Sequence, residues 1–169
     1  MKNANHKQEQ HDDEELLDAD DTNIDHTYLT FQVGESEYAV EVSCVTEIVR
    51  LQKTFAVPDV PDCVRGVINL RGKVIPLIDV RARFGLAEAQ YTDRTVVVVL
   101  EAQNSSTGLV VDGVSEVTEI PPEQIEQRAS LKSLGRQSVV KGVGKRASRV
   151  SFILDVPSLL SADGAATAS

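Results

Sequence analysis

The sequence predicts a mainly β fold built from two related subdomains, each a small barrel of about five strands, with one to three short helices. Two observations lead to this prediction. Short apolar runs alternate with polar residues and are separated by turns rich in glycine and proline. The same succession of apolar, acidic and glycine positions also occurs twice along the 169 residues, which indicates an internal duplication.

The duplication has two sections with different spacings. Residues 65–84 recur 76 positions later, so that Gly66 is matched by Gly142 and Asp79 by Asp155. Upstream, residues 40–48 recur 69 positions later, where Glu47 is matched by Glu116. The difference of seven residues indicates an insertion in the second copy.

These spacings divide the chain into expected parts. We expect a first barrel at about residues 28–86 and a second at about 93–160, and the sequence leaves open whether the two exchange strands. Residues 1–27 are predicted to be a disordered acidic tail, because they contain too few apolar residues to offset the entropy lost on ordering. Residues 161–169 are predicted to be a frayed end.

The charge of the chain is concentrated in this tail. Of the formal net charge of −9, residues 1–27 contribute −7, through nine acids and two lysines, so the remainder carries only −2. The acidic total therefore does not describe the surface of the folded part. A uniformly basic surface for nucleic acid is not expected either.

Composition also limits the chemistry. All three histidines (His6, His11 and His26) precede the first expected strand, so the body lacks the usual catalytic base and the commonest zinc ligand. The two cysteines have no CxxC spacing, and no run of 18 apolar residues or secretory signal is present. We therefore expect a cytoplasmic protein that is not an enzyme, with no catalytic residues, no metal and no cofactor.

The central element is predicted to be a β-hairpin followed by a helix, from Gly66 to Phe84. Its polar tip, Asn69 to Lys73, contains a glycine that tolerates positive φ and exposes Arg71. Asp79 then offers an N-cap for a short helix.

Four other segments complete the expected elements. Residues 29–33 alternate, which predicts a strand with one buried face, whereas the uninterrupted apolar run 95–100 predicts a strand buried on both faces between the two halves. Residues 43–49 fit either a short helix capped by Ser43 or an extended segment. A terminal helix is expected to start near Pro157.

Glu47 and Arg71 are the most interesting charged residues. Either one alone is ordinarily a solvated surface charge. They belong to the same copy, however, and an ion pair between them would orient the arginine beside Val45. A cation next to exposed apolar surface is a pattern found at binding hot spots.

Other candidate sites have simpler interpretations. Gly142 to Lys145 lacks the spacing of a phosphate loop and is expected at the second hairpin tip. Asp79 and Asp155 occupy equivalent places at helix starts, where capping alone favours aspartate. The segment Arg128–Arg149 contains seven bases and no acid, so a small barrel that binds nucleic acid is the alternative function, although the aromatic residues needed for base stacking are absent there.

The order of several motifs resembles the signature of CheW, the bacterial chemotaxis coupling family. The resemblance covers roughly residues 28–160 and rests on residues 45–48, 65–84, 108–114 and 153–155. It implies two five-stranded SH3-like barrels around a shared core. The sequence contains neither a receiver nor a phosphotransfer segment, so we expect the coupling protein itself and not CheV or CheA.

The resemblance also implies a function and a site. Members of the family are non-enzymatic adaptors that link the cytoplasmic tips of methyl-accepting chemotaxis receptors to the regulatory domain of the histidine kinase CheA, a domain of the same fold. They are recruited to receptor arrays at the inner face of the cell membrane. They do not insert directly into the membrane and do not bind nucleic acid. The positions that match receptor contacts, in the groove between the barrels, are Val45, Glu47, Gly66, Asn69 and Arg71 in the first barrel and Gly108 and Val117 in the second.

Overall fold

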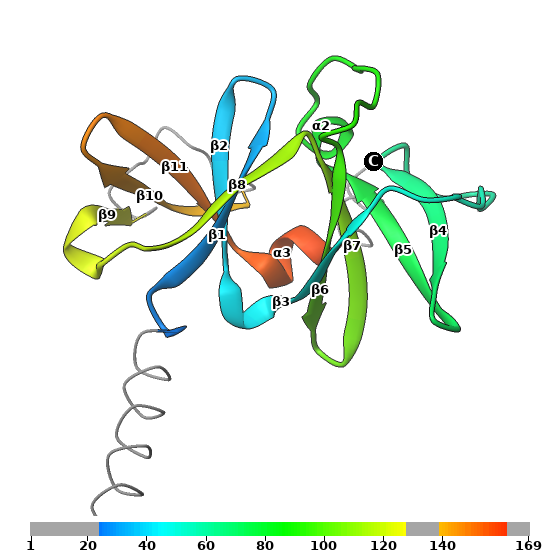
Figure 1. The fold of residues 1–169 in the computed structure, drawn as a ribbon, viewed down its shortest axis with the longest axis horizontal. Coiled ribbons are helices and arrows are strands. Elements are labelled where there is room, and N and C mark those ends of the chain that lie inside the picture. Colours follow the sequence, from blue (N-terminus) through cyan, green and yellow to red (C-terminus); the bar gives the residue numbers. More distant parts are fainter. Residues whose placement is uncertain (1–23, 128–138, 162–169) are drawn as a thin grey trace, which may run out of the picture.

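The computed structural model describes residues 24–127 and 139–161. Within these ranges the chain forms two β-sheets, with the short helix α3 (Val156–Leu160) between them (Figure 1). This arrangement confirms the predicted mainly β fold class. The expectations for residues 1–23, for residues 128–138 of the basic segment and for residues 162–169 lie outside the described residues. No helix in the described ranges is long and apolar enough to cross a membrane.

The two sheets contain six and five strands. The six-stranded sheet has the spatial order β8-β1-β2-β11-β10-β9, and the five-stranded sheet has the order β3-β6-β7-β5-β4. The strands are β1 (Thr27–Val33), β2 (Ser36–Glu41), β3 (Val45–Arg50), β4 (Val64–Leu70), β5 (Lys73–Asp79), β6 (Val96–Ala102), β7 (Ser105–Val111), β8 (Gly113–Glu119), β9 (Ile125–Gln127), β10 (Val140–Arg146) and β11 (Arg149–Leu154). The short helical turns are η1 (Val42–Cys44), α2 (Val80–Arg83), η2 (Pro122–Gln124) and α3.

Each sheet combines strands from both halves of the chain, and the strand registers repeat. In the five-stranded sheet, Leu77 of β5 lies opposite Gly108 of β7 in a parallel pair. In the six-stranded sheet, Ile153 of β11 lies opposite Ala39 of β2, also in parallel. These are the same positions displaced by 76 and 69 residues, so the structure confirms the internal duplication.

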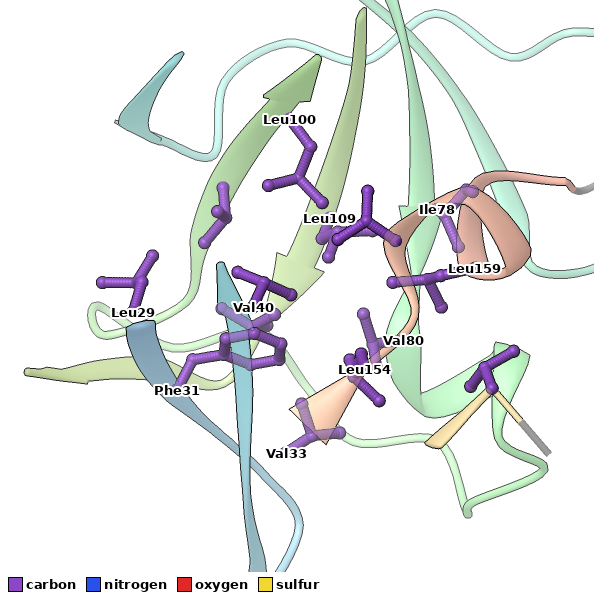
Figure 2. Close-up of a cluster of buried hydrophobic side chains, with 14 of the residues drawn as sticks. Leu29, Phe31, Val33, Val40, Ile78, Val80, Leu100, Leu109, Leu154 and Leu159 are labelled. Atoms are coloured by element: carbon purple, nitrogen blue, oxygen red, sulfur yellow. The ribbon is translucent and has the colours of Figure 1, made fainter. Parts of the chain in front are cut away.

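The main hydrophobic core lies between the two sheets. Figure 2 shows side chains from both sheets and from α3 meeting there, among them Phe31, Val40 and Leu154 from one sheet, Leu100, Leu109 and Ile78 from the other, and Leu159 from the helix. Each fully buried side chain of this size stabilises the fold by about 1.5–3 kcal/mol. Each sheet also has a smaller cluster of its own, centred on Ile68 and Leu77 in the five-stranded sheet and on Tyr28 and Ile153 in the six-stranded sheet.

This three-part core explains which strand predictions were correct. In β6, Val98 and Leu100 face the main core while Val97 and Val99 face the cluster of the five-stranded sheet, so burial on both faces is confirmed. The prediction of one buried face for residues 29–33 was wrong. That strand lies inside the six-stranded sheet, where even Thr30 is fully buried and donates a hydrogen bond to the Glu116 carbonyl.

The remaining local expectations were partly correct. Asp79 caps α2, accepting hydrogen bonds from the backbone N–H of Arg81 and of Ala82, whereas Asp155 precedes α3 without a capping bond from its side chain. Residues 43–49 were expected to be either a short helix or an extended segment. Residues 42–44 form a single 3-10 turn and strand β3 follows directly, so most of this segment is extended. Gly142 to Lys145 belongs to strand β10 and not to the hairpin tip, so the predicted position of this segment was wrong.

Candidate docking surface

The β4–β5 hairpin ends in a turn that presents Arg71. The two central residues of this turn have positive φ, 54° at Arg71 and 86° at Gly72. Positive φ at both positions is required by the type of two-residue hairpin turn whose twist matches that of the flanking strands. The Asn69 side chain accepts a hydrogen bond from the Gly72 N–H at 2.9 Å and so holds the turn closed. The arginine side chain consequently projects away from the sheet and is 70% exposed.

Arg71 reaches across to the opposite edge of its sheet. Its guanidinium donates a hydrogen bond to the Glu47 carboxylate on β3, and this ion pair joins the β4–β5 turn to the edge strand β3. The edges also meet just after β3, where the backbone groups of Phe55 and Val67 exchange hydrogen bonds of 2.8 Å. The sheet is therefore strongly curved, and the predicted pairing of Glu47 with Arg71 is present.

Two exposed apolar side chains lie on the strands that this ion pair connects. Ile48 on β3 is 43% exposed and Val74 on β5 is 63% exposed, while Val45 is half-buried against the main core. Lys73, beside Val74, donates a hydrogen bond to the Ser106 hydroxyl at 2.8 Å. We call this surface the first corner; it consists of Glu47, Ile48, Arg71, Lys73, Val74 and Ser106.

Two of the predicted contact residues, Gly66 and Gly108, are buried. A Cβ at Gly66, where φ is 133°, would lie 2.2 Å from the carbonyl oxygen of Phe55. A Cβ at Gly108 would lie 2.6 Å from a methyl group of Val97 and 2.7 Å from one of Leu77. Both glycines are required by close packing, so their expected part in docking is to shape the backbone beneath the surface.

A second corner of the same construction occurs on the six-stranded sheet. Glu116 on β8 matches Glu47 and is bound by two arginines of the β10–β11 hairpin, Arg146 and Arg149. Both arginines also bind Glu37 on β2, which is 6% exposed. The predicted contact Val117 lies here and is 58% exposed, and Val150 is 48% exposed. The second corner consists of Glu37, Glu116, Val117, Arg146, Arg149 and Val150.

Sequence reasoning did not identify this second network. The repeat supplied a signal, because Glu116 was matched to Glu47 at the spacing of 69 residues. Glu37 could not be found in this way, since its counterpart at that spacing is Ser106 and a repeat highlights only positions that agree. Glu116 itself has a pKa below its ordinary value, held down first by Arg146 and then by Arg149.

One cavity of about 510 Å³ lies away from both corners, near α2, and is lined by polar groups. Three of its four charged side chains are bound to one another, and the fourth, Arg81, donates hydrogen bonds to Asp112. Arg65 donates to Asp79 at 3.2 Å and to Glu88 at 3.4 Å, and the Tyr91 hydroxyl donates to Asp79 at 2.9 Å. Burial, followed by the bond to Asp79, raises the pKa of Tyr91 to about 12, so this hydroxyl remains protonated at neutral pH. These contacts attach the segment between the two halves to the fold.

The described residues offer little for a metal or a reaction. Residues 24–127 and 139–161 contain no group of three or more histidine, cysteine or acidic side chains able to hold a metal ion. Arg71 is a largely exposed cation held by a single ion pair, and such an arginine is suited to protein recognition. Fold and surface together define a duplicated β-sheet adaptor.

Comparison with known proteins identifies the family. The family model described as a CheW-like domain matches residues 27–164. The chemotaxis protein CheW of Klebsiella aerogenes is 32% identical over 140 residues, which cover 83% of this chain and 84% of that protein. CheW of Helicobacter pylori is 31% identical over 163 residues, which cover 96% and 93%.

A solved structure agrees. The scaffolding protein TtCheW from Thermoanaerobacter tengcongensis matches with a TM-score of 0.70 and 29% identity, over 76% of this chain and 88% of that one. The chain described here belongs to the CheW-like family, as its motifs indicated. Because this is a family of scaffold proteins, the prediction that the chain is not an enzyme is confirmed.

Proposed function

We propose that this chain is a chemotaxis coupling protein that docks the cytoplasmic tip of a methyl-accepting receptor at the first corner and joins it to the regulatory domain of the histidine kinase CheA. The observation that supports this most directly is the Glu47–Arg71 ion pair, whose arginine is 70% exposed at the turn of the β4–β5 hairpin. The names of the similar proteins, which are chemotaxis and scaffolding proteins, support the same class of function.

The geometry of the first corner suits recognition of another protein. Among the described residues, Glu47 is the one hydrogen-bonding partner of Arg71, and the pair uses a single terminal nitrogen of the guanidinium. A guanidinium has five N–H donors in a planar fork, so the others remain for acceptors on a partner.

The location follows from the partners. A coupling protein acts where receptor tips and kinase meet, so we infer a cytoplasmic protein recruited to receptor arrays at the inner face of the cell membrane. Recruitment would occur through the receptors, without insertion of this chain into the bilayer. The kinase would use a different surface from the receptor, so that both bind at once.

Mutation of the ion pair tests this proposal. Arg71→Ala and Glu47→Ala should each weaken binding to a purified receptor cytoplasmic fragment by about 1–3 kcal/mol, because the arginine is lost in one variant and no longer oriented in the other. Isothermal titration calorimetry measures the affinity, and circular dichroism checks the fold. Arg94→Ala, which removes an exposed arginine from the loop between the halves, is the matched control. Wild-type affinity in both corner variants would overturn the proposed docking site.

The alternative function, nucleic-acid binding through Arg128–Arg149, has weaker support. Every described lysine or arginine of this segment is paired with a glutamate: Lys141 with Glu41, Lys145 with Glu126, and Arg146 and Arg149 with Glu37 and Glu116. Lysines and arginines that already form ion pairs within the chain gain little binding free energy from the phosphates of a nucleic acid. A steep fall of DNA affinity with salt would be required to revive this function.

A further inference from the structure

Within residues 24–127 and 139–161, the chain passes from one sheet to the other twice. The first crossing is the turn η1, between β2 and β3, and the second is the single residue Asp112, between β7 and β8 (Figure 1). The relative orientation of the two sheets therefore depends on these short connections and on the core packed between the sheets.

Side chains lock the second crossing. Arg81 of α2 donates hydrogen bonds to both carboxylate oxygens of Asp112, at 3.0 Å from its Nε and at 2.8 Å from a terminal nitrogen. Asp112 also accepts a hydrogen bond from the Gly34 N–H at 2.8 Å, and its own N–H donates to the Gln32 carbonyl at 2.9 Å. The other terminal nitrogen of Arg81 donates to the Ala87 carbonyl at 3.0 Å. These bonds join α2, which follows the five-stranded sheet, to the β1–β2 hairpin of the six-stranded sheet.

This clamp, the pair Arg81 and Asp112, is partly protected from water. The Arg81 side chain is 22% exposed and that of Asp112 is 35% exposed. Burial opposes ionisation of Asp112, but hydrogen bonds from Arg81 and from the Gly34 N–H outweigh it and hold the pKa of this carboxyl below its ordinary value. The pair is therefore charged at neutral pH, and two parallel hydrogen bonds between a guanidinium and a carboxylate fix both groups in one orientation.

The first crossing does not have the residues for an equivalent clamp. In the repeat, Ser43 occupies the position of Asp112, and Pro157 occupies the position of Arg81. A hydroxyl and a proline ring cannot form an ion pair. A hollow of about 220 Å³ adjoins Pro157 instead, lined also by Gln103. The side-chain lock between the sheets therefore belongs to one crossing and not to its counterpart.

The clamp lies at the ends of two strands that lead to predicted contact residues. Strand β5 runs from the Arg71 turn to the residue before α2, and β8 runs from Asp112 to beyond Val117. Because the seven residues of β5 span about 24 Å, a rotation of about 5° at the clamp moves the far end of the strand by about 2 Å. Hydrogen-bond lengths vary by only a few tenths of an ångström, so even a small rotation would misplace the contacts.

We propose that Arg81 and Asp112 are positioning residues for docking. They fix the two sheets relative to each other, so that a receptor tip meets Arg71 on one sheet and Val117 on the other at a set separation. This proposal rests on the proposed docking function and extends it to a partner segment that contacts both sheets at once.

Conservative variants test the proposal. Asp112→Asn removes the negative charge, and Arg81→Lys keeps the positive charge but removes the two parallel hydrogen bonds. Each variant should bind the purified receptor cytoplasmic fragment about tenfold more weakly in isothermal titration calorimetry, because binding must then also order the sheets. Arg65→Lys is the matched control and should retain wild-type affinity. Arg65 pairs with Asp79 and Glu88, neither of which lies on the six-stranded sheet.

Residual dipolar couplings of the backbone N–H groups distinguish positioning from a purely structural role. In the wild-type chain and in Arg65→Lys, one alignment tensor should describe both sheets. In Asp112→Asn and Arg81→Lys each sheet should remain folded, but the two sheets should require tensors of different orientation or magnitude. A variant that had only lost stability would keep one common tensor.

The outcomes separate this proposal from the function on which it rests. One common tensor in the folded clamp variants overturns the positioning role, and so does wild-type receptor affinity in variants whose tensors differ. If Asp112→Asn does not fold, Arg81→Lys decides by the same two measurements; if neither folds, the pair is structural and the proposal is overturned. Wild-type affinity in Arg71→Ala overturns docking at the first corner, whereas differing tensors in the clamp variants would still support the part of the proposal that concerns the sheets.

Discussion

The two corners of this protein have equivalent backbones but carry their arginines differently. The turn residues Arg71 and Ala147 occupy equivalent positions and have the same φ of 54°. In the first corner the arginine is at this turn position and points to solvent. In the second corner the arginine comes one residue earlier, at position 146, where the first corner has Leu70.

A shift of one residue along a strand moves a side chain to the other face of the sheet. Leu70 packs on the interior cluster of the five-stranded sheet, so an arginine at the equivalent position must also face inward. A guanidinium there needs a counter-charge and further acceptors, which Glu37 and Thr118 supply at 3.1 and 3.0 Å. Arg71 is consequently an exposed side chain, as the proposed docking requires, whereas Arg146 belongs to a partly buried structural network.

The largest difference between the sheets should come from their equivalent glycines. Gly66→Ala should lower the free energy of unfolding by about 3–4 kcal/mol, because its Cβ would meet the Phe55 carbonyl oxygen at 2.2 Å at a φ unfavourable for alanine. Gly142→Ala should cost about 1 kcal/mol, since the nearest atom there is 3.0 Å away, on the edge strand β9. Urea denaturation with unchanged m-values measures both. Equal losses in the free energy of unfolding would mean that the structure tolerates a Cβ equally well at Gly66 and at Gly142.

An intermediate effect should separate the two arginines. Arg146→Ala should destabilise the fold by about 2–3 kcal/mol, because it removes one of two counter-charges of the buried Glu37. Arg71→Ala should cost less than about 0.5 kcal/mol, as expected for an exposed ion pair. The same denaturation experiment compares them. Similar costs would contradict the division into a structural and a binding arginine.

The smallest effect should appear in acid. Because Arg146 and then Arg149 lower the pKa of Glu116, its carboxylate stabilises the folded state above its ordinary pKa of 4.5, and this contribution is lost as the pH falls through the lower, folded-state value. Glu116→Gln should therefore flatten the fall in stability below pH 4.5. Unfolding curves recorded at several pH values measure the slope. Parallel slopes in the variant and the wild type would show that Glu116 does not contribute.

Local pattern was a good guide where one residue type or one repeat decided the structure. The Arg71-Gly72 turn, the cap at Asp79 and the uninterrupted run of β6 could all be predicted, since each depends on the conformational preference or apolarity of neighbouring residues. Burial of Thr30 could not be predicted, because it depends on β1 lying between β8 and β2, and β8 comes from the other half of the chain.

The sequence by itself determined the duplication, the mainly β fold class and the family, because spacing and residue type are preserved when a unit is copied. Tertiary structure alone decided that Arg71 is exposed whereas Arg146 is largely buried. Glu37 is 109 residues from Arg146, and their ion pair exists only because β2 and β11 pair in parallel and bring the β10–β11 hairpin beside it. Electrostatic interactions depend on distance in space, which no repeat in the sequence records.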